Sequence, residues 1–480
     1  MITMTVAEIA EIVAGRPVGL DPQLAISGKV EFDSRKVLAG DLFLAIKGER
    51  VDGHDYAEAA VAAGAVAVLA TRPVAVPAIL VADPLAALTA LASVAARRSK
   101  AVTIEVTGSS GKTSTKDLLA QVLAGHGRTV APPESFNNEL GFPSTVLLAD
   151  ESTEYLVLEA SARGIGHIGQ LTEIAPPALA AVLNVGSAHL GEFGSVAAIA
   201  QAKGELIEAL PADGIAVLNA DDPVVLAMAA RTSARTLTFG EHRSADVRAD
   251  RVRLDRADRA SFELVNGPDR AGVRLQVRGE HQVSNALAAA ALALACGLSL
   301  DAVARGLSAA TARSHWRMEV SETAAGVTVI NDAYNANPES MRAALKSLAV
   351  LAEGRRGLAV LGEMAELGPE SIAAHDSIGQ LSVRLKLDRV IAVGEAARPI
   401  ADGARQDGSW AGEAEWVADN EAAIARLRQL AQPGDVVLVK GSRSTEMQRV
   451  AAAIIDWFGG AVPADADPDA GPDEDRGSRR

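Results

Sequence analysis

The residues of this sequence that are best suited to phosphate chemistry lie in a short glycine-rich loop. Residues 107–113 read Thr-Gly-Ser-Ser-Gly-Lys-Thr, with two residues between the glycines. Small residues let backbone N–H groups turn toward phosphate oxygens, and the positive end of a following helix adds to their effect. We expect Lys112 to lie against the β- and γ-phosphates of a nucleotide and Thr113 to offer its hydroxyl to Mg²⁺. A plain Gly/Ser turn is the alternative, but a Lys-Thr pair between an expected strand and an expected helix disfavours it.

Glu159 and His189 are candidate metal ligands because each follows an expected buried strand. Glu159 ends the apolar run 155–158, and His189 follows the run 179–183. Both runs belong to one predicted sheet, and ligands bind at the edge where parallel strands end. Mg²⁺ prefers hard oxygen ligands such as carboxylate, so histidine is the less typical of the two. The residues alone leave metal binding and an ordinary hydrogen-bonding role equally open.

Lys203 and Asn285 lie in segments with the composition of buried helices. Lys203 stands within Ile-Ala-Gln-Ala-Lys-Gly-Glu-Leu, where a lysine is normally a solvated charge, and the residues alone favour that interpretation. Asn285 stands near the start of a helix, where a carboxamide can cap free backbone N–H groups. An amide also both donates and accepts hydrogen bonds, so it can read an adenine edge. The frequency of asparagine at helix caps favours the capping role.

A polar segment near Arg317 indicates a change of structural unit. Arg317 is a cation without an obvious partner, and Asp332 ends an expected strand. Turn chemistry accounts for Asn337-Pro338 and for the helix start that follows. It accounts less well for Asp332 and Tyr334, which we therefore treat as candidates for ligand contact.

The elements that must position these residues are those of an α/β protein. From residue 101 onward, apolar runs that end in small or polar residues, typical of buried parallel strands, alternate with helical segments. Residues 246–279 alternate polar and apolar and predict an antiparallel flap. A further strand–helix series predicts a Rossmann-like unit. We therefore expect three domains and a disordered acidic tail, with the boundaries 1–100, 101–315, 316–462 and 463–480.

Composition and charge argue against several functions. The 480 residues carry a net charge of −15, which disfavours nonspecific nucleic-acid binding and attraction to anionic membranes. The one cysteine, Cys296, excludes an intrachain disulfide and a cysteine-ligated zinc site, and its surroundings predict a small core residue. The N-terminus lacks signal-peptide character, since Thr5 and Glu8 fit a helix capping box, and no apolar run is long enough to span a membrane. We expect a cytoplasmic protein without stable membrane association.

Together these motifs resemble those of the Mur ligases, ATP-dependent enzymes that add amino acids to the peptidoglycan precursor. The loop TGSSGKTSTKD is written as in that family, and FNNELGFP, DAYNANPESM, GEMAELG and LVKGSRSTEM follow in family order over residues 5–460. The resemblance is strongest to the members that join D-alanyl-D-alanine to UDP-MurNAc-tripeptide through an acyl phosphate, with ATP and Mg²⁺. It implies a small α/β N-terminal uridine-nucleotide domain, a central P-loop ATPase-like parallel sheet domain and a C-terminal Rossmann-like α/β domain.

The resemblance also implies roles for individual residues. Lys112, Glu159, His189 and Lys203 are implied to be catalytic, and Lys203 matches a lysine that is carbamylated in several members. The implied ATP contacts are Gly108, Ser109, Ser110, Gly111, Lys112, Thr113, Ser114, Asn285, Arg317 and Asp332. The implied metal ligands are Thr113, Glu159, His189 and, if carbamylated, Lys203. The implied substrate contacts are Ser34, Arg35, Lys47, Gly48, Asp52 and His54 at the uridine end, with Asn137, Asn138, Tyr334, Asn335, Lys440, Ser442 and Arg443 nearer the reaction.

Three other activities are alternatives to this one. The ligase that adds the third residue has a similar plan, but the Asp-Asn-Pro-Arg-like motif expected of it is missing from the C-terminal part of this sequence. A folylpolyglutamate-type ligase would not explain the N-terminal FDSRKVLAGDLFLAIKGERVDGHDY. A nucleotide-dependent switch would use the loop without ligation.

One departure from the family pattern is LEASARG, where Glu-Leu-Gly or Met-Gly is expected. Glu159 itself is retained. We expect a monomer whose partners are UDP-MurNAc-tripeptide and D-Ala-D-Ala.

Overall fold

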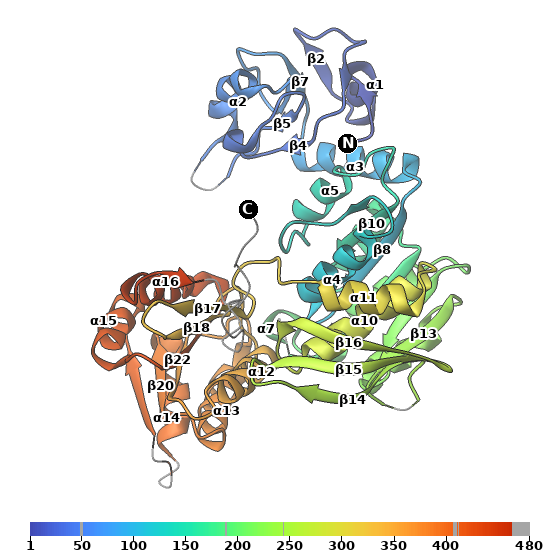
Figure 1. Cartoon of the computed structure of the whole chain (residues 1–480). Coiled ribbons are helices and arrows are strands. Elements are labelled where there is room, and N and C mark those ends of the chain that lie inside the picture. Colours follow the sequence, from blue (N-terminus) through green and yellow to red (C-terminus); the bar gives the residue numbers. More distant parts are fainter. Residues whose placement is uncertain (49–50, 188–189, 243, 407–409, 411, 463–480) are drawn as a thin grey trace, which may run out of the picture.

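Three sheet-containing units follow one another along the chain (Figure 1). The computed structural model describes residues 1–48, 51–187, 190–242, 244–406, 410 and 412–462. The N-terminal unit (blue in Figure 1) lies at one end of the central unit (cyan to yellow), and the C-terminal unit (orange to red) lies beside the central unit. This arrangement confirms the predicted α/β fold class.

The N-terminal unit is a small mixed sheet covered by short helices. Its elements are β1 (Met4–Thr5), α1 (Val6–Ile12), β2 (Arg16–Val18), β3 (Ala25–Ile26), β4 (Val30–Glu31), β5 (Leu42–Leu44), α2 (Ala57–Ala63), β6 (Ala67–Ala70), β7 (Ala78–Leu80) and α3 (Pro84–Arg98). Five of these strands form a sheet in the order β2-β7-β6-β5-β4, in which only β2 pairs antiparallel, and β1 pairs antiparallel with β3 in a separate two-stranded sheet. The capping box predicted for Thr5 and Glu8 is confirmed at the start of α1.

The central unit contains the loop and the parallel strands on which the chemistry was predicted. Its strands are β8 (Val102–Thr107), β9 (Thr129–Val130), β10 (Tyr155–Glu159), β11 (Leu179–Val182), β12 (Ile215–Asn219), β13 (Arg235–Gly240), β14 (Val247–Leu254), β15 (Arg259–Asn266) and β16 (Asp269–Arg278). Its helices are α4 (Lys112–Ala124), α5 (Gly141–Val146), α6 (His167–Ile174), α7 (Leu190–Phe193), α8 (Val196–Glu208), α9 (Pro223–Leu226), α10 (Gln282–Ala295) and α11 (Leu300–Ala309).

The nine central strands described have the order β16-β15-β14-β13-β12-β11-β8-β10-β9. The pairs from β14 to β9 are parallel, whereas β14, β15 and β16 pair antiparallel. The antiparallel strands predicted at 246–279 are therefore confirmed, and they continue the central sheet. Ile104 and Val106 of β8 face the core shared with α4 and α10, in which Leu118 and Leu119 are buried. This packing holds the first turn of α4, and with it Lys112, at the carboxyl edge of the sheet.

The C-terminal unit is a second, mostly parallel layer. Its elements are β17 (Glu319–Thr323), β18 (Thr328–Asn331), α12 (Pro338–Leu351), β19 (Gly357–Leu361), α13 (Ser371–Arg384), β20 (Arg389–Val393), α14 (Arg398–Arg405), β21 (Glu413–Val417), α15 (Asn420–Leu430), β22 (Val436–Lys440), α16 (Gln448–Trp457) and β23 (Ala461–Val462). The described strands have the order β21-β20-β19-β22-β18-β17-β23, with only β17 pairing antiparallel. The strands predicted in this part of the chain are confirmed.

Two sequence expectations concern single features of the chain. Across the described ranges, no helix is long and apolar enough to cross a membrane. Cys296 follows α10 and is partly buried, and burial raises the pKa of its thiol to about 11. The thiol is therefore protonated at neutral pH, in keeping with the packing role predicted for it.

Candidate active site

A cavity of about 950 Å³ lies between the carboxyl edge of the central sheet and the C-terminal unit. Its central walls come from the glycine-rich loop, residues 135–139, the end of β10 and the first turn of α10. Its C-terminal walls come from the segment after Arg317, the start of α12 and the loop after β22. Side chains that are hundreds of residues apart in the sequence therefore face one space.

The glycine-rich loop has the geometry of a phosphate cradle. Gly111 has φ +81°, and a Cβ there would lie 2.3 Å from Oδ1 of Asn285, so only glycine fits the position. Ser110 donates its backbone N–H to Oδ1 of Asn184 at 2.9 Å, which fixes the loop against the end of β11. The Lys112 ammonium donates to the carbonyl of Gly108 at 2.7 Å, so its side chain folds back over the loop.

Lys112 is a partly buried cation at the start of a helix. Burial lowers its pKa; the carboxylate of Glu159 opposes that shift, and the guanidinium of Arg317 adds to it. A cation in such surroundings is strongly stabilised by an anion that enters the cavity. Together with the N-terminus of α4, the position of Lys112 suits a phosphate group.

Glu159 lies in a network of hydroxyl and amide donors at the end of β10. Thr113 Oγ1 donates to its Oε2 at 3.0 Å, while Ser135 Oγ and Asn137 Nδ2 donate to its Oε1 at 2.8 and 2.6 Å. A carboxylate beside a threonine hydroxyl is a donor set that fits Mg²⁺. Among the described residues, no group of three His, Cys, Asp or Glu side chains gathers to hold a metal. The remaining predicted ligand, His189, lies outside the described residues.

The C-terminal unit contributes a buried ion pair to the cavity. The Lys440 ammonium lies 2.6 Å from Oδ2 of Asp332 and also donates to the carbonyl of Asn335 at 2.8 Å. Oδ1 of Asp332 accepts the backbone N–H of Met318 at 3.0 Å. Burial lowers the pKa of Lys440, and Asp332 opposes the shift. The pair is thus a preformed feature that fixes the polar turn after β18.

Two arginines and two aromatic rings lie next to this pair. The Arg317 guanidinium carbon is 4.1 Å from the centre of the Tyr334 ring, and that of Arg443 is 4.2 Å from the centre of the Trp316 ring. Nε of Arg317 is buried and has no hydrogen-bond partner in the part of the chain that the structure describes. Stacking holds both guanidinium groups at the wall of the cavity, where their charge favours an anionic ligand.

Two interpretations made from single residues are wrong. Asn285 is not a helix cap: it lies inside α10, where its amide donates to Oε1 of Gln282 at 2.9 Å, and it lines the cavity. Lys203 is not a solvated charge: it is 3% exposed on α8. None of the described residues gives its ammonium a hydrogen bond or ion pair. Burial lowers the pKa of Lys203 well below its usual value, and the charge of Lys112 adds to the effect.

The residues predicted at a uridine end lie in the N-terminal unit, outside the walls of the cavity. Arg35 is exposed and pairs with Asp33 at 2.8 Å, which lowers the pKa of Asp33 to about 2. His54 has both ring nitrogens engaged, because Nδ1 lies 2.6 Å from Oδ1 of Asp52 and Nε2 accepts the backbone N–H of Thr71 at 3.0 Å. His54 therefore holds its loop in place through Asp52 and Thr71. The other members of this set are Ser34, Lys47 and Gly48.

The remaining predicted residues divide clearly between the cavity and its surroundings. Gly108 and Lys203 do not line the cavity. The carbonyl of Gly108 accepts a hydrogen bond from Lys112, and Lys203 is close enough for the charge of Lys112 to lower its pKa. The predicted residues that line the cavity are Ser109, Ser110, Gly111, Lys112, Thr113, Ser114, Asn137, Asn138, Glu159, Asn285, Arg317, Asp332, Tyr334, Asn335, Lys440, Ser442 and Arg443.

Ser135 and Asn184 are site residues that the sequence analysis missed. Ser135 bonds Glu159 and lies 3.2 Å from the Thr113 hydroxyl, and Asn184 fixes the glycine-rich loop. Asn184 had a detectable signal, because it is a polar residue just after a buried strand. Ser135 had no such signal, because no sequence pattern distinguishes this serine from other polar loop residues.

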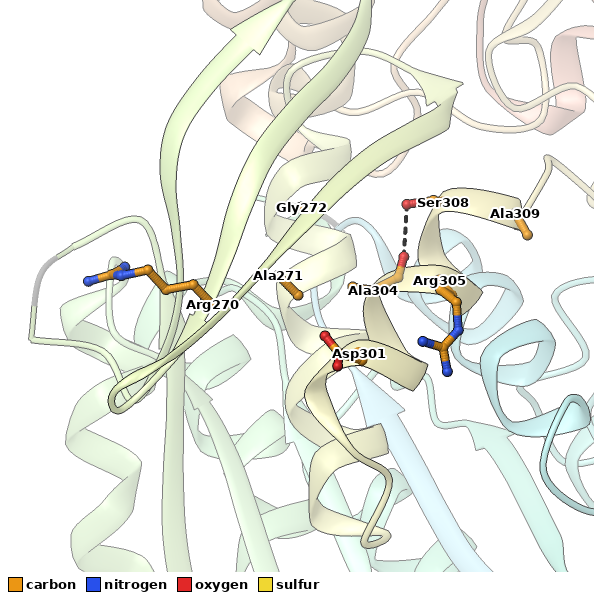
Figure 2. Close-up of a pocket in the computed structure, with 8 residues that line it drawn as sticks. All are labelled: Arg270, Ala271, Gly272, Asp301, Ala304, Arg305, Ser308 and Ala309. Carbon is orange, nitrogen blue, oxygen red and sulfur yellow. Dashed lines mark hydrogen bonds between the residues drawn. The ribbon is translucent and has the colours of Figure 1, made fainter.

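A second, shallower hollow of about 590 Å³ lies between β16 and α11 (Figure 2). Arg270 and Arg305 lie on its two sides, but Arg270 pairs with Asp250 at 3.1 Å. Ser308 donates its hydroxyl to the carbonyl of Ala304 at 2.8 Å within α11. None of the predicted site residues is among the described residues that line this hollow, so we assign the chemistry to the larger cavity.

Comparison with protein-family models finds three matches along the chain. The models are described as Mur ligase family, catalytic domain, over residues 28–122; Mur ligase middle domain, over 106–293; and Mur ligase, glutamate ligase domain, over 316–443. The second model covers most of the central sheet, from within β8 to beyond β16, and the third covers the C-terminal sheet from β17 to β22.

Relatives and solved structures agree with these matches. A Mycobacterium tuberculosis protein named UDP-N-acetylmuramoyl-tripeptide–D-alanyl-D-alanine ligase is 51% identical, covering 95% of this chain and 98% of that protein. The crystal structure of MurF from Acinetobacter baumannii has a TM-score of 0.83 at 33% identity, covering 95% and 99% of the two chains. MurF from Thermotoga maritima, in complex with ADP, has a TM-score of 0.73 at 30% identity, covering 89% and 97%.

Proposed function

This chain belongs to the Mur ligase family, and on that premise we propose that it joins D-alanyl-D-alanine to UDP-N-acetylmuramoyl-tripeptide in an ATP-dependent reaction. The product is the UDP-MurNAc-pentapeptide precursor of peptidoglycan. Relatives that bear the name of this reaction match the chain over nearly its full length. DAYNANPESM, GEMAELG and LVKGSRSTEM contribute residues to the C-terminal walls of the cavity, and FNNELGFP contributes residues to its central walls.

One observation carries this proposal: the carboxyl edges of the central and C-terminal sheets face the same cavity. Lys112 and the glycine-rich loop lie on one side, and Arg317 with the Asp332–Lys440 pair lies on the other. Transfer of a phosphoryl group onto a carboxylate brings several negative charges together, so it needs cationic groups and N–H donors placed in advance. The cavity provides such groups from both units.

The chemistry follows in two steps. The C-terminal carboxylate oxygen of the tripeptide attacks the γ-phosphorus of ATP; the bond from that phosphorus to the β–γ bridging oxygen breaks, giving an acyl phosphate and ADP. The amine of D-Ala-D-Ala then attacks the acyl carbon, the tetrahedral intermediate expels phosphate, and the nitrogen loses its proton. Lys112 and the loop N–H groups hold the phosphates in line throughout. Thr113 and Glu159 would hold Mg²⁺, which when bound neutralises phosphate charge.

The nucleoside end of ATP is assigned to the groups next to the loop. Asn285 lies behind Gly111 and has an amide suited to the adenine edge. Asp332 is the ribose contact in this proposal, because its carboxylate is held in a fixed orientation by Lys440 and Met318 N–H. Arg317 faces the phosphates, and its charge is close enough to lower the pKa of Lys112.

We propose that Lys203 acts as a carbamate. Burial lowers the pKa of its amine and so favours the neutral form, whose lone pair attacks CO₂. The new N–C bond and the loss of one proton convert a buried potential cation into an anion close to Lys112. That anion would stabilise Lys112 and act as a ligand of Mg²⁺ or orient the acyl phosphate.

The rest of the proposal concerns the whole molecule. The N-terminal unit, with Ser34 and Arg35 on its surface, binds the uridine nucleotide, and residues 1–100, 101–315 and 316–462 act as three domains. Phe32 of the N-terminal unit lies 6.5 Å, ring centre to ring centre, from Phe136, next to Asn137 at the cavity. In this proposal a long substrate runs from one unit to the other. We also propose that the enzyme is cytoplasmic and monomeric.

Phosphate release tests the reaction. The purified chain is incubated with ATP, Mg²⁺, UDP-MurNAc-tripeptide and D-Ala-D-Ala, with each component omitted in turn. We expect release only with all four and a pentapeptide product by mass. Release without either peptide substrate would support a nucleotide switch, and release with UDP-MurNAc-dipeptide plus a diamino acid would assign the preceding step.

A further inference from the structure

The C-terminal unit contacts the central unit through the start of α12. Oε1 of Glu339 accepts the backbone N–H of Ser187 at 3.2 Å and its hydroxyl at 3.0 Å, and Oε2 lies 3.1 Å from the same hydroxyl. Asn337, the N-cap of α12, donates its amide to the carbonyl of Ser109 in the glycine-rich loop at 3.4 Å. The helix start is thus attached both to the loop after β11 and to the phosphate cradle.

A second contact lies between two glycines. The backbone N–H of Gly191 in α7 donates to the carbonyl of Glu366 at 2.8 Å. A Cβ on Gly191 would lie 2.8 Å from the backbone nitrogen of Gly368 and 2.9 Å from that carbonyl oxygen. Both obstacles are backbone atoms of the C-terminal unit, so they cannot yield by a side-chain rotation. The approach of the two units therefore requires glycine at position 191.

We propose that Glu339 is a positioning residue for ligation: with the Gly191–Gly368 contact, it holds the C-terminal unit at the distance at which both walls of the cavity act on one substrate. The inference rests on the proposed function. It gives Glu339 a role in positioning the two units, and not in the reaction steps themselves. Hydrogen bonds to a carboxylate are about twice as strong as neutral ones, so the two bonds from Ser187 outweigh the long Asn337 contact.

The consequence for chemistry follows from the path of the chain. Arg317, Asp332 and Lys440 belong to the C-terminal unit, whereas Lys112 and Glu159 belong to the central unit. A small opening between the units would separate the two sets while leaving each intact. Misplacement of reacting groups by about 1 Å can cost on the order of 100-fold in rate, so a contact remote from the phosphates can control turnover.

A purely structural role for Glu339 makes a different prediction. An acidic residue in the first turn of α12 stabilises that helix through its dipole, and this effect does not depend on Ser187. In that case Glu339→Ala would lower the unfolding midpoint, and turnover would fall only as far as the folded fraction does. In our proposal turnover falls in folded protein, and the loss depends on Ser187.

The first experiment compares Glu339→Ala, Glu339→Gln and Ser187→Ala, with Glu353→Ala as the control in the exposed turn that follows the far end of α12. We expect Glu339→Ala to lower kcat about 10- to 100-fold in fully folded protein, far more than any fall in the melting temperature accounts for, with the KM for the UDP-linked peptide unchanged. Glu339→Gln retains an acceptor oxygen and should recover most of the activity. Ser187→Ala should lower kcat alone but have no further effect in the Glu339→Ala background.

The second experiment uses Gly191→Ala as a wedge between the units. Gly272→Ala is its control, because a Cβ there meets nothing within 4 Å. We expect Gly191→Ala to lower kcat at least as much as Glu339→Ala and to raise the radius of gyration measured by X-ray scattering, while Gly272→Ala changes neither. Scattering needs no turnover, so it tests the contact even if the parent chain fails to ligate.

Failure of this inference is distinguishable from failure of the proposed function. If the parent chain ligates and both Glu339→Ala and Gly191→Ala turn over within twofold of it, the positioning role is overturned and the ligase assignment stands. An unchanged radius of gyration in Gly191→Ala would likewise overturn it. If the parent does not ligate at all, the proposed function is overturned, and expansion of the wedge variant would still show that the contact holds the units together.

Discussion

The two walls of the cavity bury lysines in different ways. In the central unit, Lys203 is 3% exposed, and no described residue pairs with its ammonium. In the C-terminal unit, Lys440 is equally buried but lies 2.6 Å from the carboxylate of Asp332. A buried charge costs several kcal/mol unless it is paired, so the same residue type has opposite consequences in the two places.

The Lys440 ammonium has a counter-ion within the protein, whereas the Lys203 amine has none among the described residues. The Asp332–Lys440 pair is complete without ligand and acts as a rigid support for the turn that carries Tyr334 and Asn335. No described residue gives Lys203 an anionic partner, and the proposed carbamylation would supply an anion there. In the proposed reaction, Lys112, close to both Lys203 and Arg317, pairs with the phosphates of ATP.

The largest effect is expected from Lys112→Ala. The variant removes the cation that folds over the loop, and we expect ligation to fall by about 1,000-fold or more, near the detection limit, because charge stabilisation at the transferred phosphate is lost. Phosphate release under saturating substrates measures the loss. Lys346→Ala, at an exposed position, serves as the control, and near-parental turnover in Lys112→Ala would remove the assignment.

Lys203→Ala sharpens the comparison between the two lysines. We expect it to lose activity by at least about 100-fold, as when a group that stabilises transition-state charge is removed. Short-chain carboxylic acids should restore part of the activity, because they place a carboxylate in the space that the carbamate would fill. The rescue is measured as turnover against acetate or formate concentration. Full activity of Lys203→Ala without added acid would mean that no carbamate is needed.

Asp332→Ala tests the paired lysine. The substitution leaves the Lys440 ammonium buried without its anion, so we expect the free energy of unfolding to fall by about 3 kcal/mol. Urea denaturation at pH 7 measures the change. The double variant Asp332→Ala, Lys440→Met removes both charges and should regain most of the stability. A loss in Asp332→Ala below about 0.5 kcal/mol would place the pair among weak, surface-like ion pairs.

Lys203→Met should have the smallest effect, and it should raise the free energy of unfolding where Asp332→Ala lowers it. Removing a buried ammonium that has no partner should raise the free energy of unfolding by on the order of 2 kcal/mol in CO₂-depleted buffer, although activity is lost. Below the folded-state pKa of Lys203 the amine is protonated in both states, and the burial penalty is fully present. As pH rises from that pKa toward the usual value of 10.5, the unfolded chain binds more protons, so the parent gains stability.

The stability difference between Lys203→Met and the parent should therefore be largest at neutral or lower pH and shrink as the pH approaches 10.5. Urea denaturation across that range, with bicarbonate as a separate arm, measures it. Bicarbonate should stabilise the parent and leave Lys203→Met unchanged. A difference that grows with pH would show that the pKa of Lys203 is shifted in the other direction.

The glycine-rich loop and much of the α/β fold follow from local sequence patterns. Lys112, Thr113 and Glu159 were predicted because their roles depend on neighbours along the chain: a strand, a tight glycine turn and a helix start place them without reference to distant residues. The ends of parallel strands likewise lie on one edge wherever the strands pair. Local order of this kind can be read from spacing and hydrophobic pattern.

The burial of the polar residues and their contacts, by contrast, depend on how distant parts of the chain pack together. Lys203 and Asn285 have ordinary local sequences, and their burial comes from elements packed over them from other parts of the chain. His54 turned out to be held by Asp52 and Thr71, and Ser135 joined the Glu159 network from a loop without a pattern. The physical reason is that desolvation and hydrogen bonding between distant residues depend on how the units pack, and hydrophobic periodicity says nothing about a polar residue's distant partners.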